Sequence, residues 1–132
     1  GGLQLTWNSQ GEKGFKTAFC LTGQAPEESQ VLPKTGVVSV DSCLVDGVSW
    51  AVFTQPPEKK MGSMSAWAMI MPFGEPIELV DDDREVDELC IVRDSGPDGQ
   101  NPYVFITDMT GSLEVFILRK GGGKSKWKIG NA

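Results

Sequence analysis

The chain has 132 residues, the usual size of one domain that buries a single core without metal ions or dense disulfide cross-linking. Hydrophobic residues make up 39% and charged residues 23%, a composition that excludes an intrinsically disordered chain. The net charge of −6 argues against nucleic acid as a partner, and no apolar run approaches the roughly 20 residues that cross a bilayer, so we expect no membrane span.

Short runs in which apolar and polar residues alternate recur from the N-terminus onward. Leu3, Leu5 and Trp7 alternate with polar neighbours, and residues 15–22 repeat the pattern, so both runs predict strands. Gly, Pro, Asn and Asp between such runs favour chain reversal, and the loop Asp108-Met109-Thr110-Gly111 predicts a hairpin. Eight further runs bring the predicted strands to about ten: 36–40, 43–54, 66–73, 77–80, 88–92, 103–108, 112–119 and 126–129.

Helix signals are scarce along the chain. Residues 81–90 are the amphipathic candidate, because Asp81 or Asp82 can cap the start and Val86, Leu89 and Cys90 share a helical face. The segment Pro26-Glu27-Glu28-Ser29 predicts a single further turn. We therefore expect at most one or two short helical turns.

The pattern as a whole predicts an all-β fold. Residues 66–71 are apolar at consecutive positions, as expected of a strand between two packed layers, and we expect Trp50 and Trp67 in the core. We expect a two-sheet antiparallel β-sandwich, jelly-roll or Greek-key like, with a closed barrel as the alternative. Residues 1–132 are expected to form this single domain, excised from a larger protein because the chain begins at Gly1 without Met.

Several catalytic motifs are incomplete or absent. The sequence GGGKS at 121–125 matches only the end of a phosphate-binding loop, because Leu118 stands where the first Gly is required and residues 126–129 alternate as in a strand. Asp94-Ser95-Gly96 resembles the retroviral-type aspartic protease motif over three residues, but Arg93 precedes it, so it predicts a turn. The chain has no histidine, which excludes Ser-His-Asp and Cys-His catalysis and most catalytic zinc sites. We predict a protein that is not an enzyme, with no catalytic residues, no metal ligands and no cofactor.

The three cysteines and two charged segments have structural interpretations. Cys20, Cys43 and Cys90 lie far apart without C-x-x-C spacing, and we expect three small buried side chains. Acidic residues gather over 75–88, and five basic residues lie over 119–128 without an acid. We expect the acidic segment to be a solvated edge. The alternative is that the acidic segment of one copy faces the basic segment of another and steers assembly.

A candidate binding site centres on one aromatic residue. Trp127 stands between two lysines and is the tryptophan expected to be partly exposed, and nearby polar loop residues carry hydrogen-bonding groups. The predicted binding residues are Trp127, Tyr103, Asp98, Gln100 and Asn101.

A functional hypothesis follows from these exclusions. At the level of fold, a compact acidic β-sandwich without histidine is similar to the protruding domains of small icosahedral viral capsid proteins. The resemblance implies a recognition and self-association module that projects from a larger assembly. It implies a homodimer whose loops contact a protein or glycan receptor, at a virion surface or extracellularly. A carbohydrate-binding β-sandwich domain is the alternative, because Trp127 or Tyr103 can stack on a sugar ring.

Overall fold

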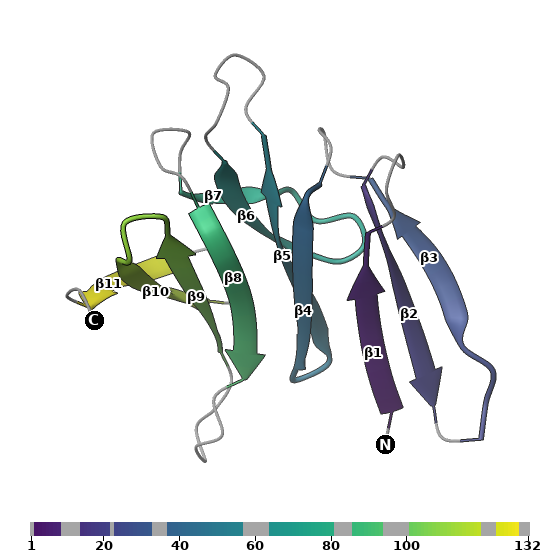
Figure 1. The fold of residues 1–132 in the computed structure, drawn as a ribbon. Coiled ribbons are helices and arrows are strands. Elements are labelled where there is room, and N and C mark those ends of the chain that lie inside the picture. The colour runs from purple at the N-terminus through teal and green to yellow at the C-terminus, as the bar shows by residue number, and fades with distance from the viewer. Residues whose placement is uncertain are drawn as a thin grey trace.

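A computed structural model describes residues 2–8, 14–21, 23–32, 37–56, 64–80, 86–93, 101–119 and 124–129 (Figure 1). These residues form eleven strands and no helix. The strands are β1 (Gly2–Trp7), β2 (Phe15–Leu21), β3 (Glu27–Val31), β4 (Ser39–Val45), β5 (Val48–Gln55), β6 (Ser65–Ile70), β7 (Ile77–Val80), β8 (Val86–Arg93), β9 (Pro102–Asp108), β10 (Leu113–Leu118) and β11 (Lys124–Ile129).

The described strands form three antiparallel sheets, with the orders β1-β2-β3, β4-β5-β6-β7 and β11-β10-β9-β8. Within each sheet the strands follow chain order, without the crossover connections of a jelly roll or Greek key. The predicted all-β class with antiparallel, sandwich-like packing is confirmed, whereas the expected two-sheet arrangement is not. Figure 1 shows the β4–β7 sheet between the other two, so β3 and β11 lie at opposite ends of the molecule.

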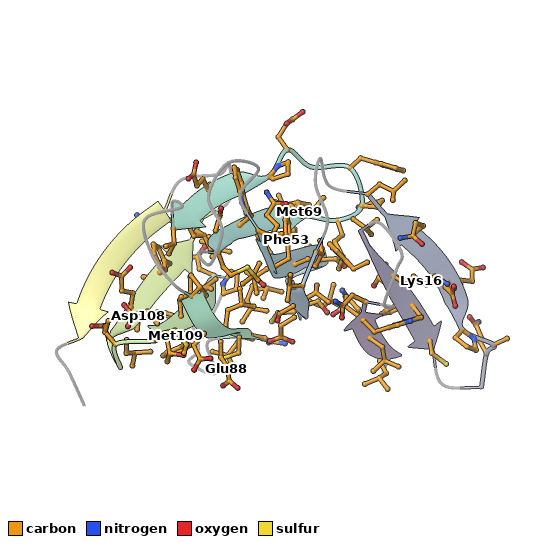
Figure 2. All side chains as sticks on the ribbon, turned by 45° about the horizontal axis from the view of Figure 1, so that its top comes forward. Lys16, Phe53, Met69, Glu88, Asp108 and Met109 are labelled. Atoms are coloured by element: carbon orange, nitrogen blue, oxygen red, sulfur yellow. The ribbon has the colours of Figure 1, made fainter. Side chains whose placement is uncertain are left out.

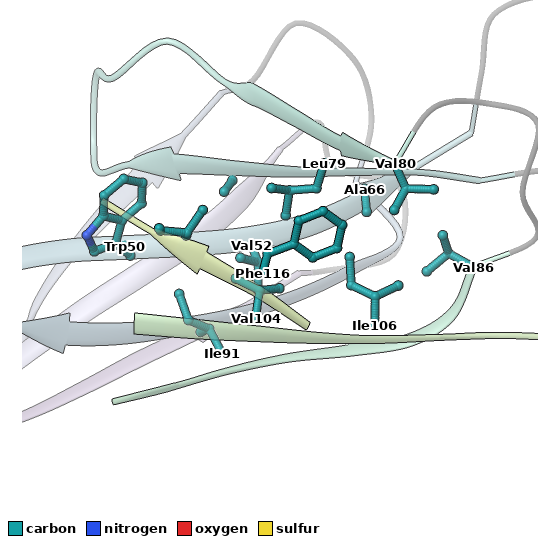
Figure 3. Packing of buried hydrophobic residues seen from close by; sticks show 12 residues of the cluster. Trp50, Val52, Ala66, Leu79, Val80, Val86, Ile91, Val104, Ile106 and Phe116 are labelled. Carbon is teal, nitrogen blue, oxygen red and sulfur yellow. The ribbon is translucent and has the colours of Figure 1, made fainter. Parts of the chain in front are cut away.

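The middle sheet packs on both faces because β5 and β6 are apolar at consecutive positions. On one face, Trp50, Val52, Ala66 and Ala68 join the inner face of the β8–β11 sheet in the larger core cluster. Figure 3 shows the Phe116 ring near the centre of this cluster. The burial of consecutive residues in β6 confirms the expected strand between two packed layers.

The opposite face of the middle sheet forms a smaller cluster with β2 and β3. Phe53 and Met69 lie side by side on this face (Figure 2), and Phe15 and Val31 pack against them from the first sheet. The rings of Phe15 and Phe53 have their centroids 5.9 Å apart with planes tilted by 41°. This offset geometry is one that aromatic pairs prefer.

Side chains connect the sheets where backbone ladders stop. The Thr6 hydroxyl donates to Ser42 Oγ at 3.0 Å and the Asn8 amide donates to the Val38 carbonyl at 2.6 Å, which holds β1 beside β4. On the other side of β4, the Ile91 N–H of β8 donates to Asp41 Oδ2 at 2.9 Å. Both junctions therefore depend on polar side chains of β1 and β4.

Two turns have the chemistry that their residues predict. Asp46 and Gly47 between β4 and β5 both have positive φ, at 49° and 75°, as a two-residue type I′ hairpin requires. In the β9–β10 loop, Asp108 Oδ1 accepts hydrogen bonds from the Thr110 N–H at 2.9 Å and the Ser112 N–H at 3.0 Å. The predicted hairpin around residues 108–111 is confirmed.

Both predicted helical segments are corrected where the structure describes them. Val86, Leu89 and Cys90 lie on β8, and residues 81–85 fall outside the described residues. A register shift between Val86 and Glu88 inserts an extra residue, so Val86 and Leu89 reach the same core at a spacing that imitates a helix. The second predicted turn is also wrong, because Glu27–Val31 forms the edge strand β3.

The tryptophan and cysteine predictions hold in part. Trp50 is buried, as expected, while Trp67 is half-buried against the smaller cluster. None of the three cysteines, all of which the structure describes, forms a disulfide; Cys20 and Cys43 are half-buried and Cys90 is exposed, so the expected burial of all three is wrong. Cys90 is exposed because it occupies an outward-facing position of β8.

Candidate functional site

The five predicted site residues divide among different places. Tyr103 lies on β9 opposite Ile117, and Trp127 lies on β11 opposite Val115, so β10 separates the two aromatic positions. Asn101 lies just before β9 and lines a cavity at one end of the larger core. Asp98 and Gln100 lie outside the described residues.

Tyr103 belongs to a sheet face that points away from the core. Val104, Ile106, Phe116 and Leu118 enter the larger cluster, so the residues that alternate with them occupy the opposite face. We call this the outer face. Its described members are Glu88, Cys90, Val92, Tyr103, Phe105, Thr107, Leu113, Val115 and Ile117.

The outer face is predominantly apolar. Val115 and Ile117 at its centre are buried among their neighbours, while Tyr103 and Phe105 are half-buried. Val92 is 42% exposed near the edge formed by β8, and Glu88 provides a charge at one end of the same strand. In register, the backbone of Trp127 extends the row that contains Val115 and Phe105. An antiparallel sheet with one face in the core ordinarily presents polar residues on the other, so this face differs from a solvated one.

Cys43 on β4 and Cys90 on β8 do not have the electrostatics of activated nucleophiles. Partial desolvation by neighbouring side chains is the main cause that raises the pKa of Cys90 above its ordinary value, although the residue is exposed on β8, and the Asp41 and Glu88 carboxylates raise it further. Burial and Asp41 likewise raise the pKa of Cys43, against a smaller opposing effect of Arg93. Both thiols are therefore protonated over a wider pH range than free cysteine, the opposite of the thiolate that nucleophilic catalysis requires.

Asn101 lines a cavity of about 230 Å³ at one end of the larger core. The surrounding side chains are mostly apolar and include Trp50, Ile70 and Leu118. Asp46 from the β4–β5 turn adds the charged group. Among the described residues, Tyr103 is not part of the lining of this cavity, so the cavity does not bring the Asn101 and Tyr103 side chains together.

A second cavity, which the sequence did not reveal, lies between the first and middle sheets. It has a volume of about 200 Å³, and we call it the inter-sheet groove. Its polar wall comes from β1, β2, β3 and the start of β5, and Met71 and Pro72 of the turn after β6 form the other side. The polar and aromatic lining residues are Gln4, Thr17, Phe19, Glu27, Ser29 and Ser49.

The wall of the inter-sheet groove has a regular order because of strand register. Gln4 of β1, Phe19 of β2 and Glu27 of β3 are direct cross-strand neighbours, so an amide, an aromatic ring and a carboxylate stand in one row. Thr17 and Ser29 form part of the next row along the same face. Directly opposite residues have Cβ atoms about 5 Å apart, which places the amide and the carboxylate about 10 Å apart on either side of the ring.

Two absences concern the described part of the chain. No group of three or more His, Cys, Asp or Glu side chains that could hold a metal ion occurs there. Nor does any helix in that part have the length and apolar character to span a membrane.

Comparison of the chain with protein-family models, with curated proteins and with solved structures gave no match.

Proposed function

We propose that this protein is a non-enzymatic recognition and self-association module, and that its outer face pairs with the outer face of a second copy. The observation that carries the proposal is the apolar character of the outer face on a sheet whose inner face already fills the core. On this face Val92 is exposed and Tyr103, Phe105 and Leu113 are half-buried, and apolar area that remains open to solvent marks sites of association. A two-fold axis would bring the same residues of both copies together, as in most homodimers.

The dimensions of the outer face support a weak dimer. The described members of the outer face lie on three strands about 4.8 Å apart and in three rows of side chains about 6.8 Å apart, which gives a projected area of about 300 Å². A stable interface buries roughly 800 Å² from each partner, and smaller ones are typical of weak or transient contacts. We therefore expect a dimer whose population rises with concentration, and loops at the sheet rims would add contact area.

The proposal includes a setting for the module. We propose that it projects from a larger assembly, such as a viral capsid, where neighbouring copies pair and surface loops contact a receptor. The support is associational, since many functions share β-sandwich architecture. The absence of histidine from the sequence and the protonated state favoured at Cys43 and Cys90 support a non-catalytic role.

Sedimentation velocity over a range of concentrations tests self-association directly. The wild-type chain is expected to shift from monomer toward dimer, and Val92→Glu is expected to remain monomeric, because a carboxylate buried between two apolar faces lacks a partner. Val38→Glu is the matched control, since Val38 is 49% exposed and lies away from the outer face. A wild-type chain that stays monomeric at the highest concentration, or two variants that behave alike, would refute the proposal.

Carbohydrate binding at the outer face is the second candidate function. The observation that favours it is the placement of Tyr103 and of the Trp127 backbone position in adjacent rows of one sheet. Flat faces with aromatic residues can stack on sugar rings. A glycan array probed with wild-type protein and with Trp127→Ala tests it, and an array without hits, or with the same hits for both proteins, would remove it.

A further inference from the structure

The inter-sheet groove contains a polar group with an unused hydrogen-bonding position. Gln4 Oε1 accepts a hydrogen bond from the Ser49 hydroxyl at 3.1 Å. Gln4 Nε2 is buried, and no group among the described residues accepts a hydrogen bond from it. If the oxygen and nitrogen of the amide are exchanged, Ser49 serves the nitrogen and the oxygen is left, so one amide atom remains available in either assignment.

Leaving a buried polar atom without a partner is unfavourable. Gln4 lines the groove, so rotation of its side chain would bring this atom to the cavity surface, where a bound polar group can satisfy it. Thr17 adds capacity nearby, because its hydroxyl donates to the Leu5 carbonyl at 3.1 Å and its oxygen can still accept. Ser29 and Ser49 contribute further hydroxyls to the same wall.

The aromatic ring of the groove is accessible. Phe19 is 41% exposed, although it lies on the face of β2 that faces the middle sheet. Its cross-strand neighbours are Gln4 on one side and Glu27 on the other. A ligand that lies over this ring therefore has an amide on one flank and a carboxylate on the other.

The charges and polarity of the groove exclude several ligand classes. An anion is disfavoured because Glu27 lines the groove and no Lys or Arg is among the described lining residues. A metal ion is disfavoured because Glu27 is the single carboxylate among those residues. A wholly apolar ligand is disfavoured because it would displace water from the hydroxyls and the amide and offer them no hydrogen bonds in return.

We propose that the inter-sheet groove binds a neutral sugar ring. The apolar C–H face of the ring lies on Phe19, and its hydroxyls hydrogen bond to the Gln4 amide and the Glu27 carboxylate. A sugar hydroxyl both donates and accepts, so it satisfies the amide in either orientation and the carboxylate at the same time. The residues belong to the first sheet and the middle sheet, whereas the outer face belongs to the third, so this site is separate from the proposed self-association surface.

Nuclear magnetic resonance of the isotope-labelled chain tests the proposal with defined probes. The side-chain amide of Gln4 gives its own resonance, and we expect glucose, galactose, mannose or N-acetylglucosamine to shift it together with the backbone amides of Thr17 and Ser49. Titration to about 100 mM detects binding with a dissociation constant as high as about 100 mM. If none of the four sugars shifts the Gln4 resonance, the proposal is wrong.

Variants separate the groove from other surfaces. Phe19→Ala and Glu27→Gln are expected to weaken binding about tenfold, and Phe73→Ala, which removes a 92% exposed ring from the turn after β6, is the matched control. Binding that survives Phe19→Ala but is lost in Phe73→Ala would overturn the proposal. Shifts confined to Tyr103 and Phe105 would also overturn it, and would instead support sugar binding at the outer face. Self-association is read separately by sedimentation, so either proposal can fail without the other.

Discussion

Replacement of Phe53 by alanine tests whether the first sheet and the middle sheet are one cooperative unit. Phe53 is fully buried and contacts Phe15 across the junction between these sheets. Removal of a buried phenylalanine ring costs about 3–5 kcal/mol, from the lost transfer free energy and the cavity that remains. A domain of this size has a free energy of unfolding of about 5–15 kcal/mol, so the variant should lose a large fraction of it.

Urea unfolding followed by far-ultraviolet circular dichroism measures this loss. With an m-value of about 2 kcal/mol/M, a change of about 4 kcal/mol lowers the midpoint by about 2 M. Phe73→Ala is the control, because that ring is almost fully exposed and its removal should change stability by less than about 0.5 kcal/mol. A loss below about 1 kcal/mol for Phe53→Ala would refute the packing argument. Two separate transitions in the wild-type chain would show that the first sheet unfolds independently.

Three further substitutions address other parts of the fold. Asp41→Asn removes a charge that adds to desolvation in raising the pKa of Cys90, so this pKa should fall. Alkylation of the Cys90 thiol by iodoacetamide, followed by mass spectrometry, should then reach half its maximal rate at a lower pH, and an unchanged pH profile would contradict this. Gly14→Ala should destabilise the protein by at least about 2 kcal/mol more than Gly23→Ala in urea unfolding, because both have positive φ but only the first Cβ would clash with a backbone carbonyl. Asp108→Ala should cost about 1–2 kcal/mol in the same assay, since the β9–β10 turn loses its bonds to the carboxylate, and Asp108→Asn should cost less.

The strands with clear alternation were predictable because burial on one face leaves a period of two in the sequence. β9 is of this kind, since its buried residues alternate with half-buried ones, whereas in β1 the alternating Leu3 and Leu5 are exposed and β10 is buried at consecutive positions. β3 was missed because its first four residues, from Glu27 to Gln30, are all exposed, and only Val31 enters a core. Edge strands of this type contribute backbone hydrogen bonds without an apolar pattern, so periodicity does not reveal them.

The incorrect helix over residues 81–90 has a specific physical cause. A bulge gives one strand an extra residue, and the buried residues on either side of it are then three apart instead of two. Val86 and Leu89 have this spacing, which matches neighbouring positions on a helix face. Local pattern alone does not separate the two structures, whereas pairing of β8 with β9 does.

The candidate sites show the same limit at longer range. The aromatic positions on β9 and β11 were identified from sequence as exposed candidates, but their common sheet face depends on the register of β10 between them. The inter-sheet groove combines Gln4 with Ser49 and Pro72, which are far apart along the chain. Gln4, Phe19 and Glu27 could have been aligned in one row from the sequence only if β3 had been predicted as a strand.

The carboxylate of Asp41 has a consequence for solubility. A β-strand whose N–H and C=O groups lack a neighbour on one side can recruit extended segments of other molecules and begin aggregation. At Ile91 that donor is already occupied by Asp41, whose negative charge also stands where an incoming backbone would have to approach. One side chain of the middle sheet thus occupies a backbone donor on the edge of β8 that an added strand would otherwise use.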